Sequence, residues 1–237
     1  DLHSFPTRRS SDLHIEGRIA FGLYAFRWAG LDHLTGDPQG IFNGNISKDY
    51  TGILLDSFQH QVFKGSSVPL LFGNLLNDIS YKNFHLSANV SFRLNYYFRK
   101  PSISYNELIN GWIGHPDYMK RWQKPGDEIS TNIPSLVYPP TAGLSLVERD
   151  AFYSRSEINI ERGDNIRLQD VRASYNWNNQ SLQNFSIGSI EFFVVASNLN
   201  VLLWRANNSQ IDPDYTGFSL SIPPSKILSF GLNVRFK

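Results

Sequence analysis

The sequence predicts an all-β protein, an antiparallel transmembrane β-barrel with long extracellular loops, and three observations lead to this fold class. Apolar and polar residues alternate along several segments, and one segment is long enough to cross a membrane. The connections between these segments are alternately short and long, as they are in outer-membrane barrels. The last segment also alternates, and it closes on an aromatic residue, Phe236, one position before the final Lys237.

The composition excludes several other classes of protein. Hydrophobic residues make up 41% of the 237 residues and charged residues 18%, which excludes a disordered chain. The formal net charge is +1, so no basic surface for nucleic acid is expected. No apolar stretch reaches about eighteen residues, so no transmembrane helix is predicted. The chain has no cysteine, which removes disulfides, thiolate metal sites and cysteine nucleophiles.

The first fourteen residues, DLHSFPTRRSSDLH, differ from everything that follows. They are polar and lack the apolar core of a signal peptide or of a twin-arginine signal. The string resembles translated sequencing-adapter sequence, so we interpret residues 1–14 as a non-native leader and expect the native N-terminal part to be missing. Residues 15–74 are interpreted as an extracellular or lumen-facing loop region. Residues 75–237 are interpreted as C-terminal barrel strands with a long external loop at 99–160.

The clearest predicted element is a hairpin over residues 75–98. Its second strand spans ~40 Å at ~3.3 Å per residue, enough to cross an apolar band about 25 Å tall when tilted. Polar residues on one face of this strand need water, because a buried unpaired polar group costs a few kcal/mol. The residues expected to face the lumen are Asn89, Arg93 and Asn95, and those expected to face lipid are Ile79, Tyr81, Leu86, Val90, Phe92 and Leu94. The two-residue turn is Lys82-Asn83, whose Asn tolerates a positive φ.

Three further strands follow along the chain. In the strand predicted over residues 166–177, the apolar residues move from even to odd positions at Gln169-Asp170, which predicts a β-bulge. The next runs from residue 190 through 196 and on to 204, and the last covers residues 228–236. The connections measure two residues after Tyr81, about sixty-five after Phe98, about a dozen after Trp177 and about twenty after Trp204.

Four segments resemble a known family, the SusC/RagA-type TonB-linked outer-membrane transporters of glycan-foraging Gram-negative bacteria. Residues 26–38 (FRWAGLDHLTGDP) are similar to the family's "aGlDpeTGdP", and residues 71–86 (LFGNLLNDISYKNFHL) to its "yGglnNtfsYKnFdL". Residues 164–175 (DNIRLQDVRASY) are similar to "sylRLknltlgY". Residues 194–199, 212–214 and the closing strand follow "vsgqNL", "DPe" and "lgLnlsF". His33 departs from a usual Pro, and Asn74 from a common Gly.

This resemblance implies the C-terminal portion of a plugged barrel of about twenty-two strands in the outer membrane of a Gram-negative bacterium. It implies import of oligosaccharides or peptides with a SusD-like surface lipoprotein, and contact with the TonB–ExbB–ExbD complex through the missing N-terminal part. Outer-membrane lipid is a further expected partner. The closing strand resembles the signal that the insertion machinery reads, carried here by Phe230, Leu232, Val234 and Phe236.

Other chemistry finds little support in the sequence. No motif of a hydrolase, metalloprotease or nucleotide-binding protein occurs, so we expect neither an enzyme nor a cofactor. Residues 43–49 imitate a calcium loop, but Lys48 and Leu54 replace the required Gly and Glu, and we expect no metal.

Four residues of the long loop are candidates for binding a substrate or partner: Trp112, Tyr118, Arg121 and Trp122. Sugars stack on aromatic rings, and Arg can bridge hydroxyls or carboxylates. The alternative is that these aromatics only pack the loop against the barrel mouth. For the protein as a whole, the alternative is a secreted all-β carbohydrate-binding module, which leaves the long strand with its polar face unexplained.

Overall fold

The computed structural model describes residues 21–139, 144–178, 186–216 and 224–236, so the proposed leader and Lys237 lie outside the described residues. The chain divides into two compact units, which we treat separately. The helical unit comprises Asp1–Val68, Tyr96–Arg162 and Ile211–Phe218. The sheet unit comprises Pro69–Asn95, Gly163–Gln210 and Ser219–Lys237.

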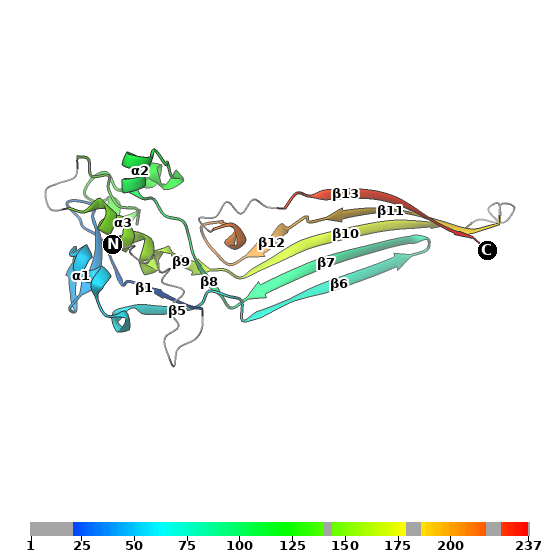
Figure 1. Ribbon diagram of the computed structural model, residues 1–237, viewed down its shortest axis with the longest axis horizontal. Helices are drawn as coiled ribbons and strands as arrows, with labels where there is room; N and C mark the ends of the chain where they lie inside the picture. Colours follow the sequence, from blue (N-terminus) through cyan, green and yellow to red (C-terminus); the bar gives the residue numbers. More distant parts are fainter. Residues whose placement is uncertain (1–20, 140–143, 179–185, 217–223, 237) are drawn as a thin grey trace, which may run out of the picture. The chain divides into compact units, whose positions relative to one another are not determined.

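The sheet unit is one antiparallel sheet of six strands, in the order β13-β11-β10-β7-β6 with β12 also paired to β10. The long strands lie side by side in Figure 1. Their bounds are β6 (Leu71–Tyr81), β7 (Phe84–Leu94), β10 (Asn165–Trp177), β11 (Ile187–Ser197), β12 (Val201–Arg205) and β13 (Ile227–Phe236). All pairs are antiparallel, which confirms the predicted strand type.

The predicted hairpin forms from β6 and β7, but it begins at Leu71 rather than at residue 75, and two further details differ from the prediction. Lys82, with φ 53°, adopts the left-handed conformation in the turn, where the sequence suggested Asn83. The second strand ends at Leu94 and does not run on to Phe98, because Asn95 turns the backbone with φ 59°. Phe98 belongs instead to the short strand β8 (Tyr97–Arg99) of the helical unit.

The predicted β-bulge is confirmed in β10. Pairing with β7 shifts register between Leu168 and Asp170, so Gln169 is the extra residue. On the other edge of β10 the partner strand is broken at the same level, and Leu199 N donates to Gln169 O at 2.9 Å. The single strand predicted over residues 190–204 is therefore two strands, β11 and β12, because the backbone leaves the extended conformation at residues 198–200.

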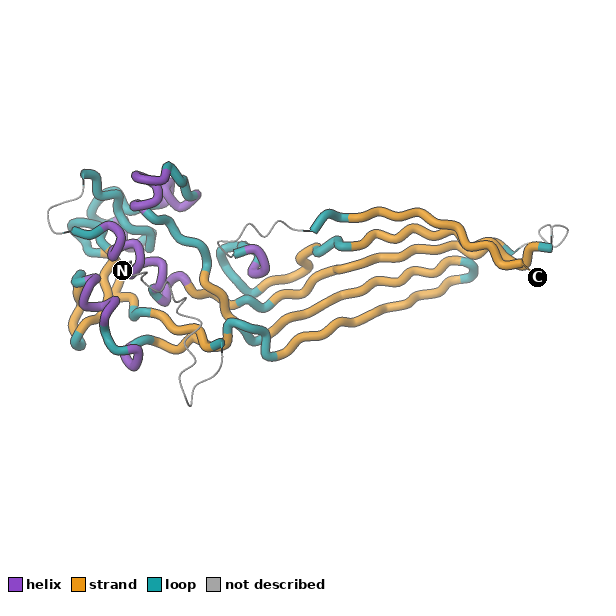
Figure 2. The backbone as a smooth tube through the Cα atoms, in the orientation of Figure 1, coloured by secondary structure: helices purple, strands orange, loops and turns teal. Residues whose placement is uncertain are grey.

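The helical unit contains more regular structure than the predicted loops suggested. Before residue 69 it contains β1 (Gly22–Ala25), β2 (Trp28–Leu31), β3 (Pro38–Phe42), β4 (Asn45–Ser47), α1 (Tyr50–Leu55), the 3-10 helix η1 (Phe58–His60) and β5 (Val62–Ser66). Between residues 99 and 160 it contains α2 (Tyr105–Gly111), η2 (Pro116–Lys120), η3 (Asp127–Ile129), α3 (Leu146–Arg155) and η4 (Glu157–Asn159). Figure 2 shows these helices in purple and the strands in orange. The short strand β8 pairs with β9 (Ile160–Arg162). The last element of this unit is η5 (Pro213–Tyr215).

Two helices of this unit, α2 and α3, start at serine caps. Ser104 Oγ accepts a hydrogen bond from Glu107 N at the start of α2, and Ser145 Oγ accepts one from Glu148 N at the start of α3. A side-chain oxygen at this position satisfies a backbone N–H that has no partner within the helix. None of the helices in the described ranges combines the length and apolar character that a membrane-crossing helix requires.

Buried aromatic residues form the core of the helical unit. One cluster joins Phe26, Tyr50, Ile53 and Phe152, and a second joins Ile103, Tyr105 and Tyr153. Within the described residues, all buried hydrophobic side chains belong to the helical unit. The sheet unit therefore has no apolar core of its own in the part that the structure describes.

Candidate functional site

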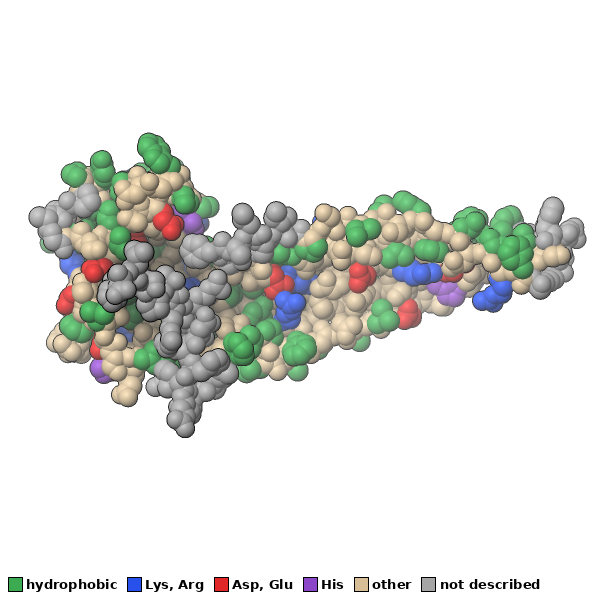
Figure 3. Space-filling model, in the orientation of Figure 1, with side chains coloured by type: hydrophobic (Ala, Val, Ile, Leu, Met, Phe, Trp, Pro, Cys, Tyr) green, Lys and Arg blue, Asp and Glu red, His purple; other side chains and the backbone are tan. Residues whose placement is uncertain are grey.

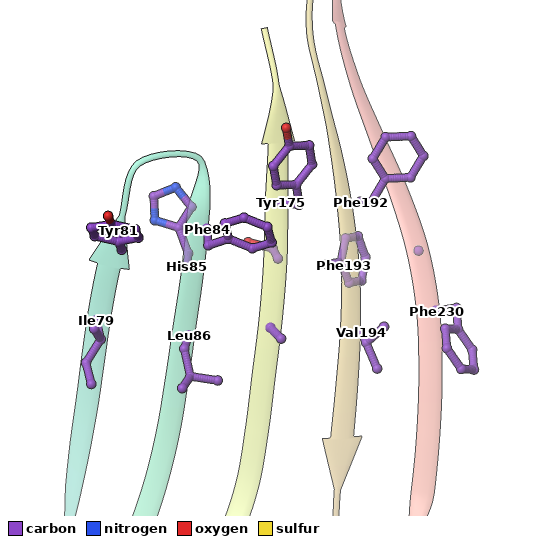
Figure 4. Close-up of a pocket in the computed structure, with 13 residues that line it drawn as sticks. Ile79, Tyr81, Phe84, His85, Leu86, Tyr175, Phe192, Phe193, Val194 and Phe230 are labelled. Atoms are coloured by element: carbon purple, nitrogen blue, oxygen red, sulfur yellow. The ribbon is translucent and has the colours of Figure 1, made fainter.

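One face of the sheet is apolar across the strands. Directly opposed residues in antiparallel strands place their side chains on the same face, so the register defines rows that run across the sheet. One row is Ile79, Leu86, Ala173, Val194 and Phe230, and the row nearer the 82–83 turn is Tyr81, Phe84, Tyr175, Phe192 and Leu232. Figure 4 shows labelled members of both rows, from the hairpin to the strand that carries Phe230.

This apolar face is exposed in the chain. Ile79 is 62% exposed and Phe230 is 74% exposed, although both belong to a continuous apolar surface. The four residues expected to form the C-terminal assembly signal, Phe230, Leu232, Val234 and Phe236, alternate along β13. Large contiguous apolar surfaces mark contacts with lipid or with another protein.

The opposite face is polar and linked by hydrogen bonds between strands. His85 Nδ1 lies 2.8 Å from Ser80 Oγ, and its Nε2 lies 3.1 Å from Asn176 Nδ2, which joins β6, β7 and β10. Arg172 donates to Glu191 at 2.9 Å, and Asn233 donates to the same carboxylate at 3.0 Å, which joins β10, β11 and β13. Figure 3 shows charged side chains and a histidine distributed over this unit among uncharged polar and backbone atoms.

The structure brings two of the three predicted lumen residues onto this polar face. Asn89 accepts from Asn74 Nδ2 at 3.4 Å and donates to Asp170 at 3.4 Å. Arg93 occupies the same face of β7, four residues further along the strand. Asn95 lies beyond the end of β7, so it does not belong to the polar face of this strand.

Sequence reasoning missed an aromatic contact on the polar face. Gly231 lies under the ring of Phe193, and a Cβ at this position would come within 2.1 Å of the ring. The Arg172 guanidinium lies 4.4 Å from the centroid of the same ring. Gly231 stands at a polar-face position between Phe230 and Leu232, so the apolar alternation of the closing strand continues past it. A glycine inside a strand was the available signal for a close contact.

In the helical unit, the Thr-Gly-Asp-Pro motif forms a tight turn between β2 and β3. Asp32 accepts from the backbone N–H groups of Leu34 and Thr35, both at 2.9 Å, and from Lys48 Nζ at 3.1 Å. Burial opposes ionisation, but the hydrogen bonds from Thr35 and Lys48 dominate and lower the pKa of Asp32 from 3.8 to about 2. The turn is therefore stabilised by an ionised carboxylate.

A buried arginine fixes this turn to α3. Arg149 is 0% exposed, and its Nε donates to Asp37 at 3.0 Å while its Nη2 donates to Ser135 O at 2.9 Å. Its guanidinium also lies 5.6 Å from the centroid of the Tyr105 ring. Sequence reasoning missed Arg149, because the segment was treated as a loop. The Ser-Leu-Val-Glu start of α3 resembles a capping box and could have revealed the helix.

The four candidate binding residues fall into different environments. Trp112 is 91% exposed and ends α2 with φ 56°. Tyr118 and Arg121 lie together, with the guanidinium 4.0 Å from the ring centroid. Trp122 is only 7% exposed and donates from Nε1 to Glu128 at 3.1 Å, and its ring fills the space beside Gly36.

The described residues contain no group of three or more His, Asp or Glu side chains that could hold a metal ion. The sheet thus combines an exposed apolar face with a hydrogen-bonded polar face, a pattern that membrane-spanning β-sheets share.

Comparison with known proteins agrees with this pattern. No known family profile matches the chain. The chain is 24% identical over 224 residues to TonB-dependent receptor P26 of Formosa agariphila, covering 84% of this chain and 20% of that receptor. It thus spans about a fifth of the length of this curated relative, as the 20% coverage shows.

Solved structures show the same fold. The structure of the RagAB peptide importer in the open-open state matches with a TM-score of 0.59 at 17% identity, over 90% of this chain and 22% of that chain. The closed-closed state matches with a TM-score of 0.51 at 19% identity, over 77% of this chain and 19% of that chain. These comparisons confirm the resemblance to TonB-dependent receptors, and the fold matches that of part of the RagAB importer.

Proposed function

We propose that this chain is the C-terminal portion of a SusC-like TonB-dependent outer-membrane transporter, with its sheet crossing the outer membrane. The observation that carries this proposal is the register of the apolar rows, which run unbroken across β6, β7, β10, β11 and β13 on one face only. Lipid would contact this face, and the polar face with Asn89 and Arg93 would line the aqueous lumen. A water-soluble carbohydrate-binding module would leave the apolar rows exposed to water, which disfavours that alternative.

The strand lengths agree with the thickness of a membrane. β6 and β7 have 11 residues each. At ~3.3 Å per residue and a tilt of about 45°, such strands rise about 26 Å, close to the apolar band of outer-membrane barrels. The edges of the sheet need further strands, since unpaired backbone groups in hydrocarbon cost several kcal/mol each. We propose a plugged barrel of about twenty-two strands, the size of outer-membrane transporters.

The helical unit would then be the external part of this portion and would contact the substrate and a SusD-like lipoprotein. The exposed ring of Trp112 and the stacked pair of Tyr118 and Arg121 support a binding surface for a peptide or an oligosaccharide. The similar solved structures are named as peptide importers, which favours the peptide class. Energy would come from the TonB–ExbB–ExbD complex through another part of the transporter.

Adjacent arginine substitutions on the two faces of β7 test the membrane assignment. In the full-length transporter, Val90→Arg should cost ~2–4 kcal/mol, because Val90 lies on the apolar face near the middle of the strand. Asn89→Arg is the matched control on the polar face and should cost far less. Urea unfolding of the transporter in lipid vesicles measures both costs. Equal costs would contradict the membrane-spanning sheet.

A pair of tryptophan substitutions tests the binding surface. Trp112→Ala should leave stability within about 0.5 kcal/mol, since the side chain is 91% exposed, and should weaken binding of the lipoprotein or uptake of substrate. Trp122→Ala should instead cost ~3–5 kcal/mol, because the side chain is 7% exposed. Thermal unfolding and uptake by cells that express each variant separate the two effects. Normal uptake and normal lipoprotein binding with Trp112→Ala would remove Trp112 from the proposed surface.

A further inference from the structure

The apolar face of the sheet is hollowed beside the 82–83 turn. The floor of this groove includes Ala173 and Val194, and Leu86 and Phe230 border it within the same row. The next row toward the turn presents the larger rings of Tyr81, Phe84, Tyr175 and Phe192 (Figure 4). Ala173 contributes only a methyl group between larger neighbours, so the apolar surface is lower at this position.

Polar groups gather at the turn end of this groove. Lys82 lies in the turn, with its Nζ 5.3 Å from the centroid of the Tyr81 ring. Tyr81 is 68% exposed. Figure 4 shows the hydroxyl of Tyr175 directed toward the same end of the sheet. The groove therefore changes from apolar side chains to a cation and phenol hydroxyls along the strands.

We propose that this groove is a binding site for an anionic phospholipid, with an acyl chain against Ala173 and Val194 and the phosphate on Lys82. This inference rests on the proposed function, since it requires the apolar face to contact lipid. The order of groups in the groove matches the order in the ligand: hydrocarbon, then a polar interface, then negative charge. Lysine near an anionic membrane surface attracts such headgroups, and tyrosine is favoured at the interface where apolar and aqueous regions meet.

The position of the groove indicates which lipid leaflet supplies the ligand. Short turns of outer-membrane barrels lie on the periplasmic side, and Lys82-Asn83 is a two-residue turn. The lipid of the periplasmic leaflet would thus have its headgroup level with Lys82 and its chains directed toward Ala173. A filled groove would also cover the exposed edge of Phe84, whose ring packs against Tyr175 at a centroid distance of 4.7 Å.

Three substitutions in the full-length transporter test the site. Lys82→Gln removes the cation from an exposed turn position. Ala173→Phe fills the groove, and Ala196→Phe is its matched control, because Ala196 lies on the same face in the row shared by Val171 and Leu228, outside the groove. Each transporter is placed in nanodiscs of equal phosphatidylglycerol and phosphatidylcholine, released into detergent and examined by native mass spectrometry for retained lipid.

The wild-type transporter should retain phosphatidylglycerol in preference to phosphatidylcholine. Lys82→Gln should reduce this preference about fivefold. Ala173→Phe should remove the retained lipid, and Ala196→Phe should behave as the wild type. If Ala173→Phe does not assemble, Lys82→Gln alone decides, and an unchanged preference overturns the proposal.

Equal retention of the two lipids by an assembled wild-type transporter would also overturn the lipid site, while leaving the transporter function intact. Failure of the proposed function is separate, because the wild-type protein would then be absent from the outer-membrane fraction and would not enter nanodiscs as a folded barrel.

Discussion

The two units of this chain differ in whether their apolar residues are buried or exposed. In the helical unit Ile53 is 2% exposed inside an aromatic cluster, whereas in the sheet unit Ile79 is 62% exposed on an apolar face. The first pattern is that of a fold with a packed core, and the second leaves an apolar face that lipid or further protein can cover. Under the proposed function, lipid covers this face, so the two units would be suited to two different solvents.

Charged residues show the same contrast. Arg149 of the helical unit is fully buried and is held by Asp37 and Ser135, because a charge inside a core needs partners. Arg172 of the sheet unit pairs with Glu191, and its side chain keeps 43% exposure on the polar face. Water can reach the second arginine, as it would in a lumen.

The largest expected effect comes from deleting residues 228–237, which removes β13. The neighbouring strand β11 pairs with β13 along its length and would lose these partners. Each backbone group left unpaired in hydrocarbon costs several kcal/mol, so the deletion should abolish assembly of the barrel rather than reduce transport. Heat-modifiable migration of the outer-membrane fraction on a gel measures assembly. A folded, membrane-inserted deletion variant would contradict the pairing of this strand within a barrel.

A milder change at the same end is Phe236→Ala. It should lower the amount of transporter in the outer membrane and leave transport per assembled molecule near normal, as expected if the terminal aromatic is read during insertion. Normal abundance combined with lost uptake would instead assign the C-terminus to transport.

The contrast in burial predicts different costs for one substitution made in each unit. Ile53→Ala should destabilise the helical unit by ~2–5 kcal/mol, because the side chain is 2% exposed in a packed cluster. Ile79→Ala should change stability by less than about 1 kcal/mol, since its side chain is 62% exposed and would contact fluid lipid. Protease resistance of the helical unit and urea unfolding of the assembled barrel measure the two costs. A large cost at residue 79 would show that this face packs against protein.

The smallest expected effect is a pH dependence of the turn at residues 32–37. The pKa of Asp32 is lowered from 3.8 to about 2 in the folded protein, so its stabilisation is present above 3.8 and is lost as pH falls toward 2. Asp32→Asn should remove this part of the acid sensitivity. Fluorescence of Trp122, whose ring lies beside Gly36 of the same turn, reports the change. Identical acid profiles for the wild type and Asp32→Asn would contradict the lowered pKa.

Local alternation in the sequence predicted most of the sheet, because side chains in a strand alternate between faces whatever surrounds them. The apolar residues Ile166 and Leu168 stand at even positions, whereas Val171 and Ala173 stand at odd positions. This change in the alternation predicted the bulge at Gln169. Local alternation could not predict the end of β7 at Leu94, because alternation continues through Tyr96 and Phe98 while Asn95 takes a left-handed backbone.

The sequence by itself determined the long strands of the sheet, their two faces and the resemblance to TonB-dependent receptors, since each depends on residues that are close in the chain. Only the tertiary structure decided the register of the rows, the groove beside Ala173 and the burial of Trp122 against Gly36. It also decided the contact of Arg149 with Asp37, which are separated by 112 residues. Such contacts depend on how distant segments pack, and no periodicity within one segment encodes which partner it will meet.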